Sequence, residues 1–398
     1  MGEICTRGRM LRLAYVSTYP PTHCGVAEYT RFLIRALKPL YPELEIYVLS
    51  DIGEGGSEVR LEGDVEVHPS FIQGGSDDYS RLLDSISEIG GVDILHVQHE
   101  YGIYGRDDRI LKACLEAKRE NLVKKVVFTL HTVYHPSSRS PETLAFQREL
   151  NRADALIVHS YLMEFELHNQ GIDPTIVRRI PHGTLLNPHL DETRKELLLS
   201  LGLREREAPG IILTTPGFLR RDKGLDLLVN AMNSLEPFRE NFTLLIAGEK
   251  RVGGDPEAEK MIEAIEEESR KLNVIFLDRY LSDDEILRIA ALSDIIILPY
   301  RDVAGKYSVS GILHLSMGSF KPIIGTRVPR LLELYQFSPR TTVTPMNPAE
   351  LAKIIKWCIR NYDYVVAYMS SLYGYAIRTQ WVRMARRHLS LYRELLTS

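Results

Sequence analysis

The sequence predicts an α/β protein made of two Rossmann-like domains, each built on a doubly wound parallel sheet. Its 398 residues exceed the size at which a single hydrophobic core usually keeps growing, so two domains are expected. Short apolar runs rich in β-branched residues alternate with longer amphipathic runs, which is typical of parallel strands joined by helices. One charged, helix-prone stretch interrupts this alternation. We therefore predict a first domain over residues 1–185, a linker over residues 186–207 and a second domain over residues 208–377.

The predicted strands are apolar on both faces, as central strands of a parallel sheet should be. In the first half they cover residues 11–17, 45–50, 65–69, 94–99, 126–131, 155–159 and 177–181. In the second half they cover residues 210–215, 242–248, 274–277, 295–299, 321–326 and 341–344. After Pro348, the apolar spacing predicts three final helices, around residues 351–358, 364–375 and 381–396. The last helix, within residues 378–398, is predicted to cross back onto the first domain.

Composition narrows the possible functions. A net charge of -4 and a pI near 6.3 argue against a nucleic-acid-binding protein with a broad basic surface. Four cysteines without C-x-x-C spacing fit a reducing compartment and argue against a disulfide framework or a structural zinc site. The first ten residues lack the apolar core of a signal peptide, and no run approaches the ~20 apolar residues of a membrane span. We expect a cytoplasmic protein.

Histidines gather just after the predicted strands of the first domain. In open α/β sheets, ligands bind outside the carboxyl ends of the strands, so these positions are candidates for a site. The segments are TYPPTHCG, QHEYGIYG, HTVYH, HSY and PHGT. The acceptor-side candidates that they supply are His23, His99, Glu100, Tyr101, Thr132 and His182, and His131 is the strongest single candidate. A metal site is the competing interpretation. We do not expect one, because no H-E-x-x-H or similar short-spaced ligand pair occurs.

The corresponding loops of the second domain are cationic and rich in glycine. Small residues that lead into a helix expose backbone N–H groups and the positive end of the helix dipole, which suits a phosphate. Ser310 and Gly311 occupy such a position, and Arg220 and Lys223 can approach the same anion from a neighbouring loop. We therefore expect a diphosphate-bearing donor on the second domain and an acceptor on the first. A dinucleotide oxidoreductase is disfavoured, because no G-x-G-x-x-G follows the first strand.

Nine motifs in order resemble the family 4 retaining glycosyltransferases with the GT-B fold, and most closely their mannosyltransferase-like branch. They are TYPPTHCGVAEYT, HVQHEYGIYG, TLHTV, ADALIVHS, IPHG, GFLRRDKGLDLLV, LLIAGE, LSDDEILRIAALSDIIILPYR and SGILHLSMGSFKPIIGT, spread over residues 11–335. The resemblance implies that the two domains face each other across a cleft and that the tail is helical. It also implies transfer of a hexose with retention, from GDP-mannose first and a UDP-sugar second, without a metal or tightly bound cofactor.

The resemblance also implies roles for single residues. The Gly25 amide would approach the donor phosphate or the reacting sugar, and His131 would contact the transferred sugar or the leaving group. Arg220 and Lys223 would neutralise the diphosphate, so His131, Arg220 and Lys223 are the predicted catalytic residues. The Ser310 and Gly311 amides would bind the phosphates. The predicted contacts to the base and ribose are Gly248, Arg279, Tyr280 and Leu281.

Two departures from the family pattern leave alternatives open. Tyr307 and Leu315 stand where the family commonly has two glutamates, and Phe218 stands where an arginine is usual, with the arginine displaced to Arg220. The alternative functions are a nucleotide-sugar epimerase or hydrolase with the GT-B fold, and a non-catalytic nucleotide-sugar-binding protein. For retention, we favour attack of the acceptor on the leaving-group face over a double displacement through Glu100.

The acceptor stays open among a glycan, a lipid-linked sugar and a small polyol. The basic amphipathic stretch of residues 106–125 suggests peripheral association with the inner face of a membrane, with a solvated helix face as the alternative. The sequence predicts no oligomeric state.

Overall fold

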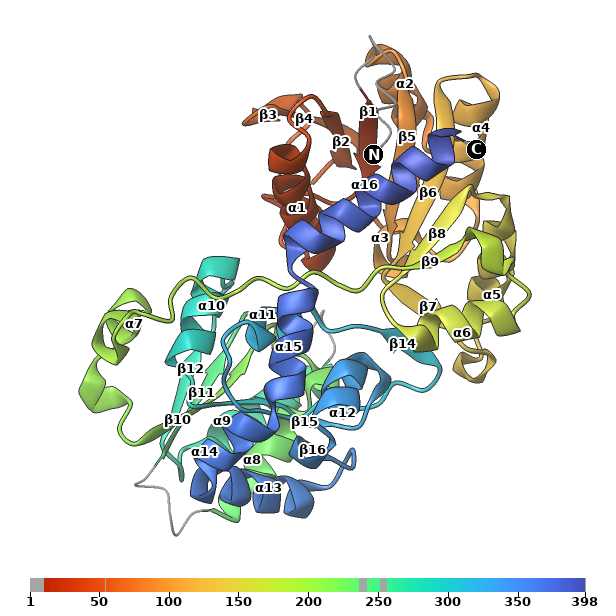
Figure 1. Ribbon diagram of the computed structural model, residues 1–398. Coiled ribbons are helices and arrows are strands. Elements are labelled where there is room, and N and C mark those ends of the chain that lie inside the picture. The colour runs from red at the N-terminus through yellow and green to blue at the C-terminus, as the bar shows by residue number, and fades with distance from the viewer. Residues whose placement is uncertain (1–10, 54, 236–241, 251–255, 398) are drawn as a thin grey trace. The chain divides into compact units, whose positions relative to one another are not determined.

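The computed structural model describes residues 11–53, 55–235, 242–250 and 256–397, and these residues divide into two units (Figure 1). The first unit contains the described residues up to Gly183, together with Ala304–Val309 and the chain from Trp381 onwards. The second unit contains Thr184–Val303 and Ser310–Gln380. Two segments from the second half of the sequence are therefore parts of the first unit.

The first unit is built on an eight-stranded sheet with the order β3-β4-β2-β1-β5-β6-β8-β9. All neighbouring strands are parallel except β3 and β4. Each of the seven predicted strands is present, and β3 is an additional short edge strand. The bounds are β1 Arg12–Val16, β2 Glu45–Asp51, β3 Arg60–Glu62, β4 Val65–Phe71, β5 Val92–His99, β6 Val123–Leu130, β8 Ala155–Val158 and β9 Val177–Arg179.

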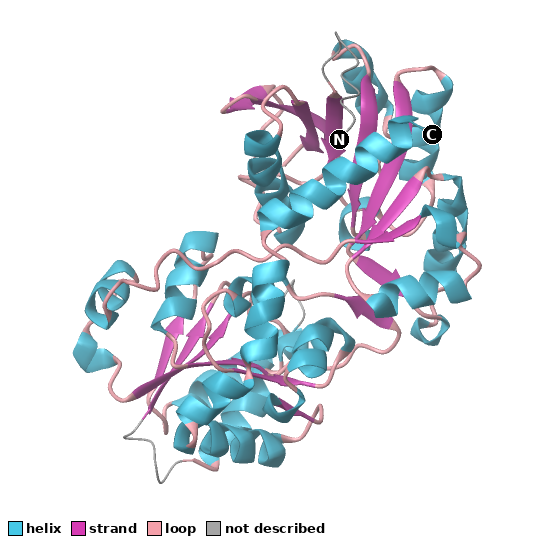
Figure 2. Ribbon diagram, viewed as in Figure 1, coloured by secondary structure: helices cyan, strands magenta, loops and turns pink. Residues whose placement is uncertain are grey.

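Helices cover both faces of this sheet (Figure 2). Successive residues of β5 face opposite sides of the sheet. Val97 packs with Phe128 of β6 in one apolar core, whereas His96 faces Tyr392 of the last helix on the other side. That helix lies against α1 and contacts β6. The helices of this unit are α1 Gly25–Leu37, α2 Ser80–Glu88, α3 Tyr101–Tyr104, α4 Arg109–Arg119, α5 Pro141–Glu149, α6 Tyr161–Asn169 and α16 Trp381–Thr397.

A two-stranded antiparallel ribbon joins a second-half segment to the first unit. β7 (Thr132–Tyr134) follows β6, and it pairs with β14 (Lys306–Ser308). Neither strand was predicted from the sequence. Each has only three residues, and neither alternates in polarity for long enough to give a period.

The second unit is built on a six-stranded parallel sheet with the order β12-β11-β10-β13-β15-β16. All six predicted strands are present: β10 Ile211–Pro216, β11 Phe242–Ala247, β12 Val274–Leu277, β13 Ile295–Leu298, β15 Ile323–Thr326 and β16 Thr342–Val343. Its helices are α7 Arg194–Ser200, α8 Leu225–Asn233, α9 Pro256–Ser269, α10 Asp283–Leu292, α11 Gly311–Met317, α12 Leu332–Phe337, α13 Pro348–Arg360, α14 Tyr362–Tyr368 and α15 Ser370–Arg378.

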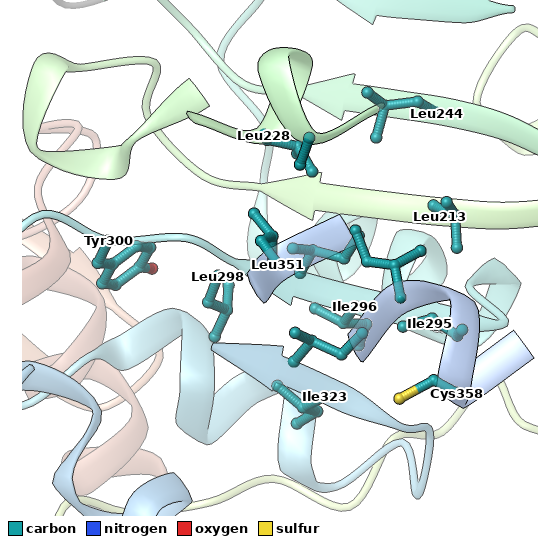
Figure 3. Packing of buried hydrophobic residues seen from close by; sticks show 14 of the residues in the cluster. Leu213, Leu228, Leu244, Ile295, Ile296, Leu298, Tyr300, Ile323, Leu351 and Cys358 are labelled. Atoms are coloured by element: carbon teal, nitrogen blue, oxygen red, sulfur yellow. The ribbon is translucent and has the colours of Figure 1, made fainter. Parts of the chain in front are cut away.

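The core of the second unit lies between this sheet and the helices that pack on it. Figure 3 shows Leu213, Ile296 and Ile323 of three neighbouring strands packed with Leu351 of α13. The segment of residues 186–207 belongs to this unit. Its helix α7 packs on α10, and Leu197 and Leu198 are buried in a second apolar cluster of the unit.

The chain ends in four helices, α13 to α16, whereas the apolar spacing predicted three. The predicted helix over residues 364–375 is divided at Met369, whose ψ of 6° departs from helical geometry. The Met369 N–H closes α14 on the Val365 carbonyl, and the Met369 carbonyl then accepts from Leu372. Since the Met369 side chain is fully buried, its packing fixes the turn.

Within the described ranges, no helix is both long and apolar enough to span a bilayer. The helix of the basic stretch, α4, buries its apolar residues Ile110, Leu111 and Cys114 in the core of the first unit. Its exposed side carries charged residues such as Lys112 and Arg119, so this side of α4 is mainly charged.

Candidate functional site

Each sheet has a point at which the strand order reverses. In the first sheet the chain moves outward from β1 to β2 and β4 on one side, and from β5 to β6, β8 and β9 on the other. In the second sheet the reversal lies between β10 and β13. The crevice outside the carboxyl ends of the strands at such a point is the usual ligand site of an open α/β sheet. The predicted residues lie at these two edges, and we describe each unit separately.

Tyr29 of α1 is the centre of an aromatic cluster in the first unit. Its ring centroid lies 4.8 Å from that of His131, 5.2 Å from His159 and 5.1 Å from His182. Trp381, the first residue of α16, lies 4.9 Å from Tyr29 on another side. Three histidines predicted at strand ends are therefore brought together. Tyr29 was not predicted from the sequence, although it follows Gly25 by four residues and so lies one helical turn further along α1.

The His131 side chain has one hydrogen-bonded partner among the described residues. Its Nε2 lies 3.0 Å from Oε1 of Gln98, a fully buried residue of β5. Burial lowers the pKa of the imidazole well below its usual range, and the neighbouring His159 and His99 lower it further. His131 is therefore neutral at pH 7, and it suits a hydrogen-bonding role better than an ionic one.

His99 and Tyr101 were predicted as acceptor-side residues, but both are buried. The His99 ring is fully enclosed and stacks on Phe146, with centroids 4.8 Å apart, and on Tyr104, at 5.6 Å. Burial lowers the pKa of His99 to about 3, so the ring behaves as a neutral aromatic group. The Tyr101 hydroxyl donates to Gln147 Oε1. The enclosure of the His99 ring favours a structural role for His99, whereas Tyr101 also lines the groove described below.

Glu100 and Thr132 interact with each other. Thr132 Oγ1 donates to Glu100 Oε2 at 2.6 Å, and Lys306 Nζ of β14 lies 3.9 Å from the other carboxylate oxygen. Thr132 is buried, and Glu100 is half-buried. Both residues therefore help to hold the β7–β14 ribbon at the end of β6.

Gly25 is the exposed first residue of α1. A Cβ atom added at Gly25 would meet no atom within 4 Å, and no side chain caps this helix. The fold therefore leaves space and uncapped backbone N–H groups at the helix start, as contact with a phosphate would require. His23 and Cys24 are half-buried beside it, and Cys24 packs against the apolar core.

A groove of about 860 Å³ opens at the same end of the first unit. Three glycines, Gly74, Gly75 and Gly105, line it together with the rings of Tyr101 and Phe146. Gly75 and Gly105 must be glycine, because both have positive φ and a Cβ on either would come within 2.8 Å of the other residue's Cα. Charged side chains surround the groove: Arg106, Asp107, Asp108, Glu142 and Glu149.

The second unit carries a compact cationic cluster at its strand ends. Asp222 Oδ2 accepts from Arg220 at 2.9 Å and from Arg330 at 2.5 Å. Lys223 Nζ lies 3.9 Å from the centroid of the buried Tyr300 ring. Three cations thus surround one carboxylate and leave a net positive charge. The predicted Arg220 and Lys223 are brought together, whereas Arg330, which follows β15, was missed.

The pKa values in this cluster follow from its charges. Burial alone would raise the pKa of Asp222, but the positive charges of Arg220, Arg330 and Lys223 lower it to about 2. Burial lowers the pKa of Lys223, although the Tyr300 hydroxyl and Asp222 act in the opposite direction. An incoming phosphate would add negative charge next to partly desolvated cations, where its attraction is stronger than in open water.

Ser310 and Gly311 begin α11 beside this cluster. The Ser310 hydroxyl lies 3.2 Å from the Tyr300 hydroxyl, and its oxygen also accepts from the Leu313 N–H as the helix cap. Since the side chain of Ser310 is already engaged, backbone amides are what this position offers to a ligand.

Other cations of the same loops have different partners. Lys250 pairs with Glu266 and Asp278, and Arg301 pairs with Asp226. Arg327 donates to the Thr342 carbonyl and lies 3.7 Å from Glu350. The side chains of these cations therefore do not bind Asp222, although the Arg301 backbone N–H donates to the Asp222 carbonyl at 3.0 Å.

The predicted base-binding segment lies at the ends of β11 and β12. Gly248 has a φ of +150°, and a Cβ there would lie 2.1 Å from the Gly217 carbonyl oxygen, so two strand-end loops meet closely. Arg279 is exposed and pairs with Glu285 at 2.5 Å, whereas Leu281 is buried. The rings of Phe218 and Tyr280 lie 6.4 Å apart. Phe218, the unusual residue of its loop, thus brings a second aromatic ring to Tyr280.

The two positions that lack the usual glutamates are both built into the fold. Tyr307 lies in β14 opposite Val133, and Leu315 lies on α11 and packs against an apolar cluster of the second unit. Across the described residues, no group of three or more His, Cys, Asp or Glu side chains is arranged to hold a metal ion.

Comparison with known families decides the assignment. Residues 24–186 match the family described as Glycosyltransferase Family 4, and residues 210–361 match that described as Glycosyl transferases group 1. The chain belongs to the family 4 glycosyltransferases. No curated protein matches this glycosyltransferase sequence.

Solved structures agree with this assignment at the level of the fold. A glycosyltransferase from Rickettsia africae is 17% identical, with a TM-score of 0.73, 98% of this chain covered and 99% of that one. Anabaena HepE in complex with UDP is 18% identical, with a TM-score of 0.71 and coverage of 97% and 100%. Sucrose-phosphate synthase from Thermosynechococcus elongatus is 18% identical, with a TM-score of 0.74 and coverage of 97% and 99%. The predicted GT-B fold is confirmed.

Proposed function

We propose that this glycosyltransferase moves a hexose, mannose first, from a nucleotide-diphosphate sugar to a glycan, lipid-linked or small polyol acceptor, with retention. The observation that carries the proposal is the cluster of Arg220, Lys223 and Arg330 beside the start of α11. Three cations and the amides of Ser310 and Gly311 suit a diphosphate. The second unit would bind the donor, and the first unit would admit the acceptor.

The proposed chemistry is mainly electrostatic. As the anomeric C–O bond lengthens, negative charge develops on the leaving diphosphate, and Arg220 and Lys223 would stabilise it. Arg330 is a further candidate for this role, because it shares Asp222 with Arg220. These cations supply the charge that a metal ion would otherwise supply, so we propose a metal-independent reaction. Neutral His131 would bind a hydroxyl group of the transferred sugar.

Retention is proposed to occur by attack on the leaving-group face. A double displacement needs a carboxylate free to attack the anomeric carbon. Glu100 accepts a 2.6 Å hydrogen bond from Thr132 and lies near Lys306, which supports a structural role for it. A Glu100→Gln enzyme should therefore keep measurable transfer. Complete loss of transfer with unchanged donor affinity would favour the double displacement.

The groove lined by Tyr101, Phe146 and Gly105 is the proposed acceptor site of the first unit. Glu142 and Arg106 at its margin can exchange hydrogen bonds with hydroxyl groups. We propose a cytoplasmic enzyme. Association with a membrane face would depend on charge, because the apolar side of α4 is buried in the core.

The donor is tested by thermal shift. GDP-mannose should raise the melting temperature more than UDP-glucose, and a transfer assay with the better donor then tests an acceptor panel. UDP-sugars are the second choice, supported by the UDP complex of the Anabaena relative. Release of free sugar or an epimer without acceptor would favour a hydrolase or epimerase. The positions of Tyr307 and Leu315 favour one other candidate, a non-catalytic nucleotide-sugar-binding protein, which would bind nucleotide without turnover.

A further inference from the structure

The environment of His131 specifies which ring nitrogen carries the proton. Gln98 Oε1 lies 3.0 Å from His131 Nε2, and a carbonyl oxygen can only accept. With the Gln98 amide in this orientation, which leaves its own Nε2 buried without a partner, the proton of His131 is on Nε2 and Nδ1 carries the lone pair. The described residues offer Nδ1 no hydrogen bond. This nitrogen is left as an acceptor for a group that comes from outside the unit.

The groups around the ring keep it neutral. Tyr29 meets the ring edge to face, with centroids 4.8 Å apart and planes at 84°. His159 lies 5.2 Å away, and His99 acts from β5, so both would oppose a second positive charge. The carboxylate of Glu100 is held by the Thr132 hydroxyl and Lys306. Burial disfavours the charged form further.

Two of these neighbours have the rigidity that positioning needs. Gln98 is fully buried at the next-to-last position of β5, and Tyr29 is 2% exposed, with its ring held among three histidines and Trp381. No described residue forms a hydrogen bond with the Tyr29 hydroxyl, so Tyr29 holds the His131 ring in place through packing of its own ring. A partner that fixes the second nitrogen and orientation of a histidine is a recurring device in functional sites.

We propose that Gln98 and Tyr29 are positioning residues that hold His131 as a neutral Nε2–H tautomer, whose Nδ1 accepts a hydrogen bond from a sugar hydroxyl. The proposal rests on the proposed function for the identity of the ligand, but the tautomer itself is a property of the free protein. The hydroxyl keeps its proton, so no charge moves. Gln98 rather than a carboxylate at this position is essential, because a carboxylate would favour the imidazolium, which has no acceptor nitrogen.

The tautomer is tested without substrate by ¹⁵N NMR of histidine-labelled protein, with the His131 signals assigned from His131→Gln. We expect a proton on Nε2, none on Nδ1, and no titration of the ring between pH 6 and about pH 8, where an ordinary histidine with a pKa near 6.5 still changes charge. A proton on Nδ1, or titration in this range, would overturn the proposal. Failure to detect any sugar transfer would count against the proposed function, but it would not affect the conclusion about the tautomer, because the NMR measurement uses the free protein.

Variants test the two positioning residues. Gln98→Leu should mix the tautomers and lower kcat/KM by about 10- to 100-fold, with unchanged affinity for free GDP or UDP. Gln98→Glu, which is nearly isosteric, should bring the titration of His131 into the neutral range, so that activity is lost at acid pH and recovers at alkaline pH. Tyr29→Leu should lower kcat/KM, and Tyr29→Phe should restore most of it.

Gln147→Glu is the matched control. Gln147 is also fully buried in the first unit, but it bonds to Tyr134, Tyr101 and Gln170 and to no histidine. Its variant should leave the pH profile and the His131 signals unchanged, whatever its effect on stability. If Gln98→Glu shows the wild-type pH profile, or Tyr29→Phe is as impaired as Tyr29→Leu, the positioning roles are refuted.

Discussion

Replacing Gly25 with alanine should separate stability from activity. A Cβ at Gly25 meets no atom within 4 Å, and the residue is helical with no positive φ, so the fold has room for the methyl group. Alanine lowers the conformational entropy of the unfolded chain, so the free energy of unfolding should be unchanged or rise by about 0.4–1 kcal/mol. The same methyl group would occupy the space in front of the α1 amides.

The expected loss of activity follows from the contact that would be displaced. A hydrogen bond to a charged group contributes about 1.5–3 kcal/mol. At about 1.4 kcal/mol per tenfold change, kcat/KM should fall by roughly 10- to 100-fold. Steady-state transfer kinetics and urea unfolding of the same preparation measure the two effects.

Gly102→Ala is the control, since Gly102 is also an exposed helical glycine with nothing within 4 Å of an added Cβ. Its kcat/KM should be unchanged, and its free energy of unfolding should change in the same way as that of Gly25→Ala, because the entropy argument applies to both glycines. If Gly25→Ala transfers sugar within twofold of the wild type, the amides of α1 do not approach the donor. If Gly25→Ala instead lowers the free energy of unfolding, the fold does not have room for a methyl group at this position.

Three further results are expected. Arg330→Met should weaken the binding of GDP or UDP about 10- to 100-fold, measured by calorimetry, because a charge-assisted hydrogen bond is lost. Arg327→Met is the control and should not weaken binding, because the Arg327 guanidinium interacts with Thr342 and Glu350 instead. Equal losses in the two variants would contradict a phosphate-binding role for the cluster around Asp222. Asp222 has a pKa lowered from 3.8 to about 2, so its charge stabilises the fold above pH 3.8, and that contribution is lost as the pH falls through about 2. At about 1.4 kcal/mol per pKa unit, Asp222→Asn should therefore cost about 2.5 kcal/mol at pH 6 and much less at pH 2, as measured by urea unfolding. A cost independent of pH would refute this. Gly183→Ala places a Cβ 2.1 Å from the Trp381 ring and should lower stability by about 1–3 kcal/mol, read as a lower Tm, with Gly102→Ala as the unaffected control.

The sequence alone predicted the sheets well because their strands are long apolar runs. β5 and β6 bury nearly every residue, so their pattern stands out without any knowledge of their neighbours. β7 and β14 were missed for the opposite reason. Three residues carry no period, and their pairing joins positions more than 170 residues apart, as with Lys306 and Tyr134.

The sequence indicated the kinds of residue that gather at the strand ends better than it indicated which individual residues contact one another. Strand ends indicated where histidines and cations would gather, and Arg220 and Lys223 do meet around Asp222. The burial of His99 could not be predicted, because its position after a strand gives no sign that Tyr104 and Phe146 enclose it. Tyr29, Gln98 and Arg330 were missed because an isolated tyrosine, glutamine or arginine becomes informative only when its partner is known.

The assignment of the last helix to the first unit has a consequence for how the protein is made. Trp381 packs on Tyr29, and Tyr392 bonds to His96, yet 198 residues separate Trp381 from Gly183. At about 5–20 residues per second, a ribosome needs roughly 10–40 seconds to add them. During that interval the nascent first unit lacks the cover for one face of its sheet, so the half that is synthesised first is completed last.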